Sequence, residues 1–268
     1  MASPDATLVT TEIIDRVMRI TLQAPPANTY SHAMMRQLDE AILDARFNDD
    51  VEVIILTGAG EKFFCAGADI GMLQDAEPRF KYQFCLHANE TLLRLEHTPK
   101  VVIAAINGHC VGGGLEVAMA CDLRVAMTGS YKLGLPEMKL GVLPGTGGTA
   151  RLTRLVGKTA ALDMMLHSDM FGPQEALDKG IVSRVFEAEN VADFQQQALA
   201  MAQNLASPNQ AALAGGLIKR SVQSGADLGL EQHLALEREL QQRLFTSEDA
   251  KEGIRSFQEK RPPAFTGR

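Results

Sequence analysis

The chain has 268 residues, of which 46% are hydrophobic and 22% charged, and its formal net charge is −7. This composition is typical of a soluble globular protein with one large domain, or one domain and a smaller appendage. The negative charge disfavours nucleic acid as a partner. The cysteines, Cys65, Cys85, Cys110 and Cys121, form no CxxC pair and no zinc-type spacing with histidine. We therefore expect free thiols, no metal site and a reducing compartment.

The first elements follow from alternation and capping. Residues 7–22 alternate polar and apolar side chains, which predicts a β-hairpin that turns near Asp15 and Arg16. Ser31 follows a proline-containing break and is the expected N-cap of a helix that runs to about Phe47. The N-terminus has no basic segment followed by an apolar one, and no apolar run is long enough to span a membrane. We expect a cytoplasmic protein without a membrane segment.

Two aliphatic runs, 51–58 and 100–108, each end in glycine and predict strands buried on both faces. A helix is expected between them over 78–97, and another strand over 122–127. This alternation predicts an α/β fold with mostly parallel strands. Ligands gather at the carboxyl ends of such strands, so the glycine-containing turns after the two runs should lie near a site.

Beyond about residue 190 the pattern becomes helical. Amphipathic periodicity predicts helices over four stretches: 191–206, 209–223, 230–245 and 248–260. We expect these helices to pack onto the core or onto another subunit.

The stretch GHCVGGGLEVAMACD, residues 108–122, places a glycine run at the start of a helix. Glycines let a ligand approach the backbone, and the free N–H groups of a helix start favour negative charge. Such a site can hold an anion permanently, as with phosphate, or transiently, as an oxyanion hole. Glu116 lies in the first helical turn among apolar neighbours, so it is a candidate acid or base; the alternative is a solvated residue that the helix dipole favours. CAGADI, residues 65–70, is a second donor segment in which Asp69 is a candidate helix cap.

Glu137 is the second candidate, in the loop GLPEMKLGVLPGTGG of residues 134–148. A loop glutamate is ordinarily a surface residue. Together with Glu116, however, it can hold one water molecule, with one carboxylate taking a proton and the other delivering one. That division of labour requires two different pKa values, which burial and hydrogen bonding can supply.

Other motifs are less compatible with the pattern. GTGGTA, residues 145–150, fits a dinucleotide fingerprint with Asp163 beyond it, but Pro144 rather than a strand precedes it. GKT at 157–159 lacks the glycine that a phosphate-binding loop requires. His109, beside the glycine run, is expected to be structural.

Four stretches together resemble the crotonase superfamily, and most of all its enoyl-CoA hydratases: FFCAGADI, AAINGHCVGGGLEVAMACDLRVA, LPEMKLGVLPGTGGTARLTRLVG and EDAKEGIRSFQEKRPPAF. The resemblance implies a spiral of ββα units over residues 1–195 and a helical trimerisation region over 196–268. Two trimers of such proteins commonly stack into a hexamer, so a homotrimer or homohexamer is expected.

The resemblance also implies site residues. The backbone N–H groups of Ala68 and Gly113 would form the oxyanion hole, and Glu116 and Glu137 would be catalytic. The remaining residues of the expected thioester-binding stretch are Ala66, Asp69 and Ile70. Gly71 stands where several relatives have lysine, and Thr29-Tyr30 replaces the Ala-Leu of a family element, so contacts to coenzyme A or the acyl group are expected to differ there.

The implied reaction is syn addition of water to the α,β double bond of an enoyl-CoA thioester, in fatty-acid β-oxidation. Our hypothesis is that Glu137 acts mainly as acid and Glu116 mainly as base or as anchor of the water molecule. Coenzyme A would be part of the substrate, with no separate cofactor. The acyl pocket is expected within residues 72–97, including Met72, Leu73 and Phe84. The alternatives are a Δ3,Δ2-enoyl-CoA isomerase, a branched-chain (methylglutaconyl-type) hydratase, and a non-catalytic acyl-CoA-sensing or RNA-binding oligomer.

Overall fold

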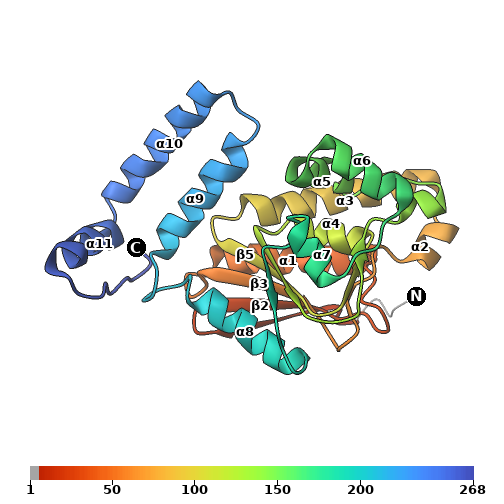
Figure 1. The fold of residues 1–268 in the computed structure, drawn as a ribbon, viewed down its shortest axis with the longest axis horizontal. Helices are drawn as coiled ribbons and strands as arrows, with labels where there is room; N and C mark the ends of the chain where they lie inside the picture. Colours follow the sequence, from red (N-terminus) through yellow and green to blue (C-terminus); the bar gives the residue numbers. More distant parts are fainter. Residues whose placement is uncertain (1–5) are drawn as a thin grey trace.

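The computed structural model describes residues 6–268 (Figure 1). Residues 1–5, part of the N-terminus for which no signal sequence was expected, lie outside the described residues. The predicted hairpin is confirmed: β1 (Val9–Ile14) pairs antiparallel with β2 (Val17–Leu22), and Asp15 and Arg16 make the turn with positive φ.

The hairpin begins a six-stranded sheet of order β1-β2-β3-β5-β7-β9. Every pairing after the hairpin is parallel, as the sequence predicts. The additional strands are β3 (Val53–Gly58), β5 (Val101–Ile106), β7 (Leu123–Met127) and β9 (Arg184–Phe186).

A second sheet contains three short parallel strands: β4 (Phe63–Cys65), β6 (His109–Val111) and β8 (Leu133–Gly134). Each short strand follows a strand of the large sheet and precedes helical structure, so the chain repeats the ββα unit of the expected spiral. Gly58 and Gly108 lie where the chain passes between the sheets. A Cβ atom at either position would lie 2.4 Å from the nearest backbone oxygen, so only glycine fits.

The helices cover both faces of the large sheet (Figure 1). Buried side chains of α1 and α3 pack on one face, and Phe194, Ala198 and Ala202 of α8 pack on the other. Ser31 caps α1 by accepting from the N–H of Met34, as expected. The helices of the core are α1 (His32–Phe47), α2 (Ile70–Asp75), α3 (Pro78–His97), α4 (Gly113–Met119), α5 (Gly148–Val156), α6 (Lys158–His167), α7 (Pro173–Asp178) and α8 (Val191–Gln203), with a 3-10 helix, η1 (Glu137–Leu140).

Three further helices, α9 (Ala212–Gly225), α10 (Leu230–Phe245) and α11 (Glu248–Glu259), extend away from the sheet as a helical arm (Figure 1). Position 196, where the helical region was expected to begin, falls inside α8, which packs on the sheet. None of the helices within residues 6–268 has the length and apolar character needed to cross a lipid bilayer.

A buried ion pair joins α9 to the core. The Nζ of Lys219 lies 2.8 Å from the carboxylate of Asp122 and also donates to the carbonyl oxygens of Leu95 and Lys100, at 2.7 and 3.0 Å. Burial raises the pKa of Asp122 and lowers that of Lys219, so the cost of desolvation outweighs their attraction. Removing one partner would leave the other charge buried without compensation.

We therefore expect Asp122→Ala to lower the free energy of unfolding by about 3 kcal/mol or more. Asp227→Ala is the matched control, because Asp227 pairs with Arg154 at the surface, where both side chains are more than half exposed. The control should change stability by less than about 1 kcal/mol. Urea unfolding followed by circular dichroism measures both, and equal effects would contradict the assignment.

Candidate active site

A cavity of about 360 Å³ lies where the three short strands end. Residues that follow β4, β6 and β8 line it, among them Ala68, Gly113 and Glu137. The sequence predicted a site at the carboxyl ends of the buried strands β3 and β5. The structure places it one strand later, because each buried strand is followed by a short strand of the second sheet before the chain reaches the cavity.

The glycine run at the start of α4 is required by close backbone and side-chain contacts. Gly112 has φ +58, a conformation that favours glycine. A Cβ atom on Gly113 would lie 2.1 Å from the hydroxyl oxygen of Tyr30, and one on Gly114 would lie 2.0 Å from the carbonyl oxygen of Cys65. Larger residues would therefore push α4 away from β4 and from Tyr30.

Two N–H groups are left free to face the cavity. Ala68 forms a parallel bridge with Tyr30, in which the N–H of Tyr30 donates to Gly67 and the N–H of Asp69 donates to Tyr30. The N–H of Ala68 therefore points away from Tyr30. Gly113 begins α4, so its N–H has no partner within the helix. In the part of the chain that the structure describes, neither N–H donates to a backbone carbonyl.

Segments 66–68 and 112–113 are also in contact. A Cβ atom on Gly67 would lie 3.0 Å from the nitrogen of Gly113. Two unpaired donors from adjacent segments on one cavity wall can stabilise an anionic oxygen, which is the role that the resemblance implies for this pair.

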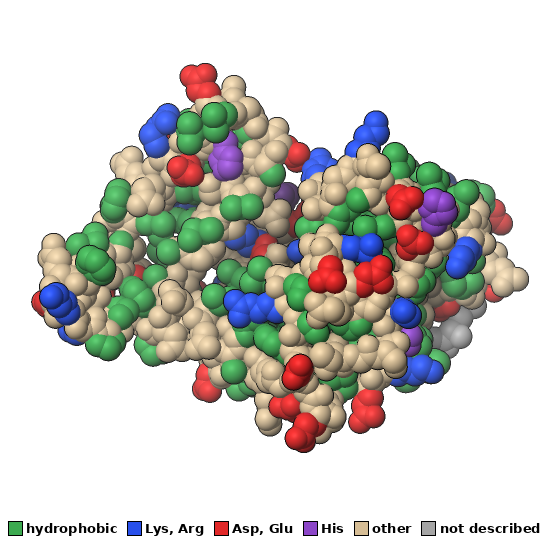
Figure 2. Space-filling view, in the orientation of Figure 1, with side chains coloured by type: hydrophobic (Ala, Val, Ile, Leu, Met, Phe, Trp, Pro, Cys, Tyr) green, Lys and Arg blue, Asp and Glu red, His purple; other side chains and the backbone are tan. Residues whose placement is uncertain are grey.

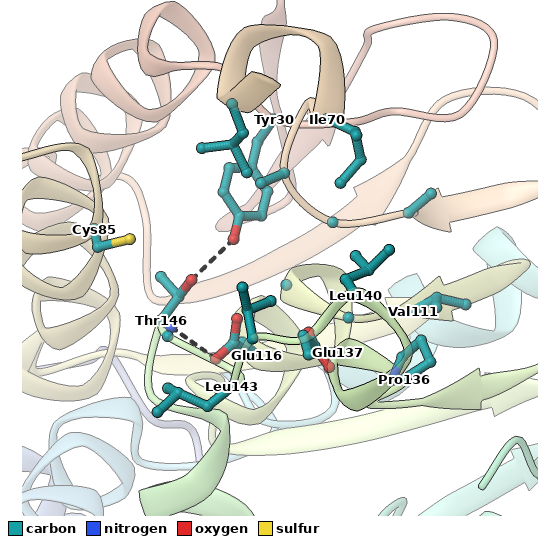
Figure 3. A pocket seen from close by; sticks show the side chains of 18 of the residues that line it. Tyr30, Ile70, Cys85, Val111, Glu116, Pro136, Glu137, Leu140, Leu143 and Thr146 are labelled. Atoms are coloured by element: carbon teal, nitrogen blue, oxygen red, sulfur yellow. Dashed lines mark hydrogen bonds between the residues drawn. The ribbon is translucent and has the colours of Figure 1, made fainter. Parts of the chain in front are cut away.

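Glu116 is buried at 2% exposure and is hydrogen-bonded (Figure 3). Its Oε1 accepts from the N–H groups of Thr146 and Gly148, at 2.8 and 2.7 Å. Burial raises the pKa of Glu116, and these two donors oppose that rise by favouring the ionised form. The alternative of a solvated first-turn glutamate is wrong.

Glu137 lines the same cavity in a different environment (Figure 3). Its Oε2 is buried and has no hydrogen-bond partner within residues 6–268. Burial, together with the nearby Glu116 carboxylate, raises the pKa of Glu137 to about 7. Glu137 is the first residue of the short 3-10 helix η1 and does not lie in an irregular loop. Gly141, in the left-handed conformation, ends this helix after one turn.

The other residues expected in the site divide into two groups. Ala66 and Ile70 line the cavity, as do Leu73 and Phe84 of the predicted acyl pocket. Asp69 does not line it: its carboxylate caps α2 by accepting from the N–H groups of Gly71 and Met72. The cap was the other role considered for Asp69.

Met72 packs against the main core instead of lining the cavity. His109 also lies outside the lining, and its Nδ1 accepts from the N–H of Lys132 at 3.1 Å. Within residues 6–268, no group of three His, Cys, Asp or Glu side chains is arranged to hold a metal ion.

Sequence reasoning missed the contacts that Thr146 and Gly148 make with Glu116, and the contacts that Tyr30 makes with Gly113 and Thr146. The GTGGTA run could have pointed to Thr146 and Gly148, because it resembles a nucleotide-binding loop and its N–H groups do bind an anion. Their anion is the carboxylate of Glu116 in the same chain. Tyr30 was visible only as a departure from a family element, because its contacts come from residues far away in sequence.

Comparisons with known proteins show the family to which this chain belongs. The profile of the enoyl-CoA hydratase/isomerase family matches residues 12–268. The (E)-benzylidenesuccinyl-CoA hydratase of Thauera aromatica is 38% identical over 97% of this chain and 99% of its own. The short-chain-enoyl-CoA hydratase of Clostridium acetobutylicum is 36% identical over 92% of both. A crystal structure of an enoyl-CoA hydratase from Geobacillus kaustophilus has a TM-score of 0.94 and 44% identity over 98% of both chains. The chain therefore belongs to the enoyl-CoA hydratase/isomerase family of the crotonase superfamily and has its fold.

Proposed function

We propose that this protein is an enoyl-CoA hydratase, which adds water to the α,β double bond of an enoyl thioester. The observation that carries the proposal is one cavity that combines two unpaired N–H donors with two carboxylates in different environments. Coenzyme A belongs to the substrate, and the reaction needs no separate cofactor. The hydratase names of relatives with similar length and 36–38% identity support the same activity.

The thioester carbonyl oxygen accepts from the N–H groups of Ala68 and Gly113. A water molecule held between the carboxylates attacks the β-carbon, and its proton passes to Glu116. Negative charge moves to the thioester oxygen as an enolate, which the two donors stabilise; one such donor is typically worth about 10²–10³ in rate. Glu137, which keeps its proton up to about pH 7, then protonates the α-carbon. Because both carboxylates act from one side, the addition is syn.

An isomerase that moves the double bond is the alternative within the family. It transfers one proton between two carbons of the same substrate and can run with a single carboxylate. Hydration requires groups that hold a water molecule and divide two proton transfers between them. The presence of both Glu116 and Glu137 on the cavity wall therefore favours hydration.

The cavity restricts the acyl group only broadly. Its wall is mainly apolar, with Leu73, Phe84 and Leu143 among the lining residues, which suits a hydrocarbon chain. Lys81 is the one cationic side chain among the described residues that line it. A second candidate substrate is therefore an enoyl group that carries a distal carboxylate, as in a methylglutaconyl-type thioester.

Hydration of crotonyl-CoA tests the activity and is measured as the loss of the enoyl-thioester absorbance. Longer, branched and carboxylate-bearing thioesters extend the test to the acyl group.

Glu116→Gln and Glu137→Gln should each lower kcat by about 10²–10⁴-fold, because each removes one proton-transfer group. Thioester binding, measured by calorimetry, should remain nearly unchanged. Glu90→Gln is the control, since Glu90 is exposed on α3. Near-wild-type hydration by either cavity variant would contradict the role given to that residue.

The pH profile distinguishes the two glutamates. Burial raises the pKa of Glu137 to about 7, so its acid form is present below that pH and is lost above it. We expect kcat/KM for hydration to fall as the pH rises through about 7, because Glu137 then loses the proton that it donates. In Glu137→Gln, the residual activity should lack the alkaline fall. An unchanged alkaline fall in that variant would assign the acid role to another group.

We also propose that the helical arm joins copies of this chain into a trimer or a hexamer. Large apolar side chains along the arm are exposed to solvent, and Figure 2 shows hydrophobic side chains gathered over α10 and α11. The most exposed are Ile218, Val222, Leu230, Phe245 and Phe257. Apolar patches of this kind are usually covered in a native assembly.

Sedimentation velocity of the full chain should therefore give a mass of three or six protomers. Phe257→Glu, which places a charge on the arm, should reduce the assembly to smaller species. Phe47→Glu is the matched control, because Phe47 is 80% exposed but lies on α1 outside the arm. A monomeric wild-type protein would contradict the proposal.

A further inference from the structure

Tyr30 makes contacts in the site that the proposed chemistry leaves unused. Its side chain is 2% exposed, yet it lines the cavity with its hydroxyl group toward Thr146 (Figure 3). The two hydroxyl oxygens lie 2.9 Å apart. Tyr30 stands where the resembling family element has leucine, so its hydroxyl group adds a polar group to a cavity wall that is mainly apolar.

The backbone of Tyr30 holds the first oxyanion donor. Its N–H donates to the carbonyl oxygen of Gly67 at 2.9 Å, and its own carbonyl oxygen accepts from Asp69 at 3.0 Å. These two bonds bracket Ala68 and turn the N–H of Ala68 toward the opposite side. The orientation of this donor therefore depends on the segment that carries Tyr30.

The side chain of Tyr30 contacts the second donor. The hydroxyl group lies over Gly113 so closely that any Cβ atom there would overlap it, at 2.1 Å. The ring also packs against Phe84 of α3, with the ring centroids 5.9 Å apart. The ring is thus wedged between α3 and the start of α4, which limits movement of Gly113 relative to Ala68.

The hydroxyl group reaches the support of Glu116. Thr146 binds Tyr30 through its side chain, and its backbone N–H donates to Glu116 at 2.8 Å. The carbonyl oxygen of Thr146 accepts from Arg151 at 2.9 Å, and Arg151 in turn pairs with Glu96 at 2.7 Å. Thr146 is therefore held from three directions, and the hydrogen bond to Tyr30 is the one that connects it to the oxyanion donors.

We propose that Tyr30 is a positioning residue that fixes the position of the Glu116 carboxylate relative to the N–H donors of Ala68 and Gly113. It acts through Thr146 on one side and through Gly67, Asp69 and Gly113 on the other. This inference rests on the proposed hydratase function for its kinetic consequences, while the contacts themselves do not depend on it. A misplaced carboxylate slows the chemical step more than it weakens binding of the large thioester.

Tyr30→Phe keeps the ring and removes the hydroxyl group. We expect kcat to fall by about 3- to 10-fold, the effect of one hydrogen bond, while KM changes by less than about two-fold. Thr146→Val should produce a similar loss, and Thr146→Ser, which keeps a hydroxyl group, a smaller one. The double variant Tyr30→Phe/Thr146→Val should be little worse than either single variant, because both remove the same hydrogen bond.

Tyr131→Phe is the matched control. Tyr131 is also buried, and its hydroxyl group donates to the carbonyl oxygens of Ile106 and Met127, away from the cavity. Its loss should lower the melting temperature and leave kcat unchanged. If Tyr30→Phe behaves in the same way, or if the losses from Tyr30→Phe and Thr146→Val are fully additive, Tyr30 is only a structural residue and the proposal is wrong.

A measurement without turnover separates this inference from the proposed function. Acetoacetyl-CoA resembles the substrate but lacks the double bond to be hydrated, and its enolate absorbs in the near ultraviolet. The wild-type protein should stabilise the enolate of bound acetoacetyl-CoA. At saturating acetoacetyl-CoA, Tyr30→Phe should give a smaller spectral change, while the Kd for acetoacetyl-CoA stays similar. If wild type gives the signal without hydrating any enoyl thioester, the proposed function fails and the Tyr30 test still stands. If wild type hydrates enoyl thioesters and Tyr30→Phe leaves the enolate signal unchanged, the positioning role of Tyr30 is wrong and the proposed function stands.

Discussion

The buried carboxylate of Glu116 is the group on which the rest of the site depends. An ionised carboxylate without partners would cost several kcal/mol in a protein interior. The N–H groups of Thr146 and Gly148 reduce that cost, and they belong to a loop some thirty residues later, at separations of 30 and 32 positions. The requirement that Glu116 be hydrogen-bonded therefore fixes the loop over α4. The same loop begins at η1, so it also brings Glu137 to the cavity.

The two glutamates have similar intrinsic chemistry and become different through their surroundings. Glu116 is deeply buried but accepts from two backbone N–H groups. Glu137 has a buried oxygen, Oε2, that has no hydrogen-bond partner within residues 6–268. Burial raises the pKa of both carboxyl groups; backbone hydrogen bonds oppose that rise at Glu116, whereas the nearby Glu116 carboxylate adds to it at Glu137. Different surroundings of this kind are what the proposed division into a base and an acid requires.

Close backbone approach brings these groups together. Gly113 and Gly114 allow α4 to pack directly against Tyr30 and Cys65, and Gly58 and Gly108 allow the small sheet to pack against the turns of the large one. The ββα repeat then aligns three short strands whose ends supply Ala68, Gly113 and Glu137. Tyr30 contacts the segments that carry Ala68 and Gly113, and it also contacts Thr146, which donates to Glu116. A side chain outside the proposed reaction therefore connects the donors to the carboxylate.

The sequence by itself determined the elements and the candidate groups. Continuous aliphatic runs predicted β3 and β5, capping predicted the start of α1, and the glycine run before Glu116 predicted exposed N–H donors, because periodicity and backbone conformation are local properties. Local reasoning also paired Glu137 with Glu116, and the resemblance to crotonases added the N–H groups of Ala68 and Gly113 as the expected donors. Only the tertiary structure decided that Asp69 does not line the cavity, that the GTGG loop binds Glu116 rather than a nucleotide, and that Tyr30 joins three segments. These outcomes depend on contacts between residues 30 or more positions apart, or on competition for a hydrogen bond, and neither is encoded in a local pattern.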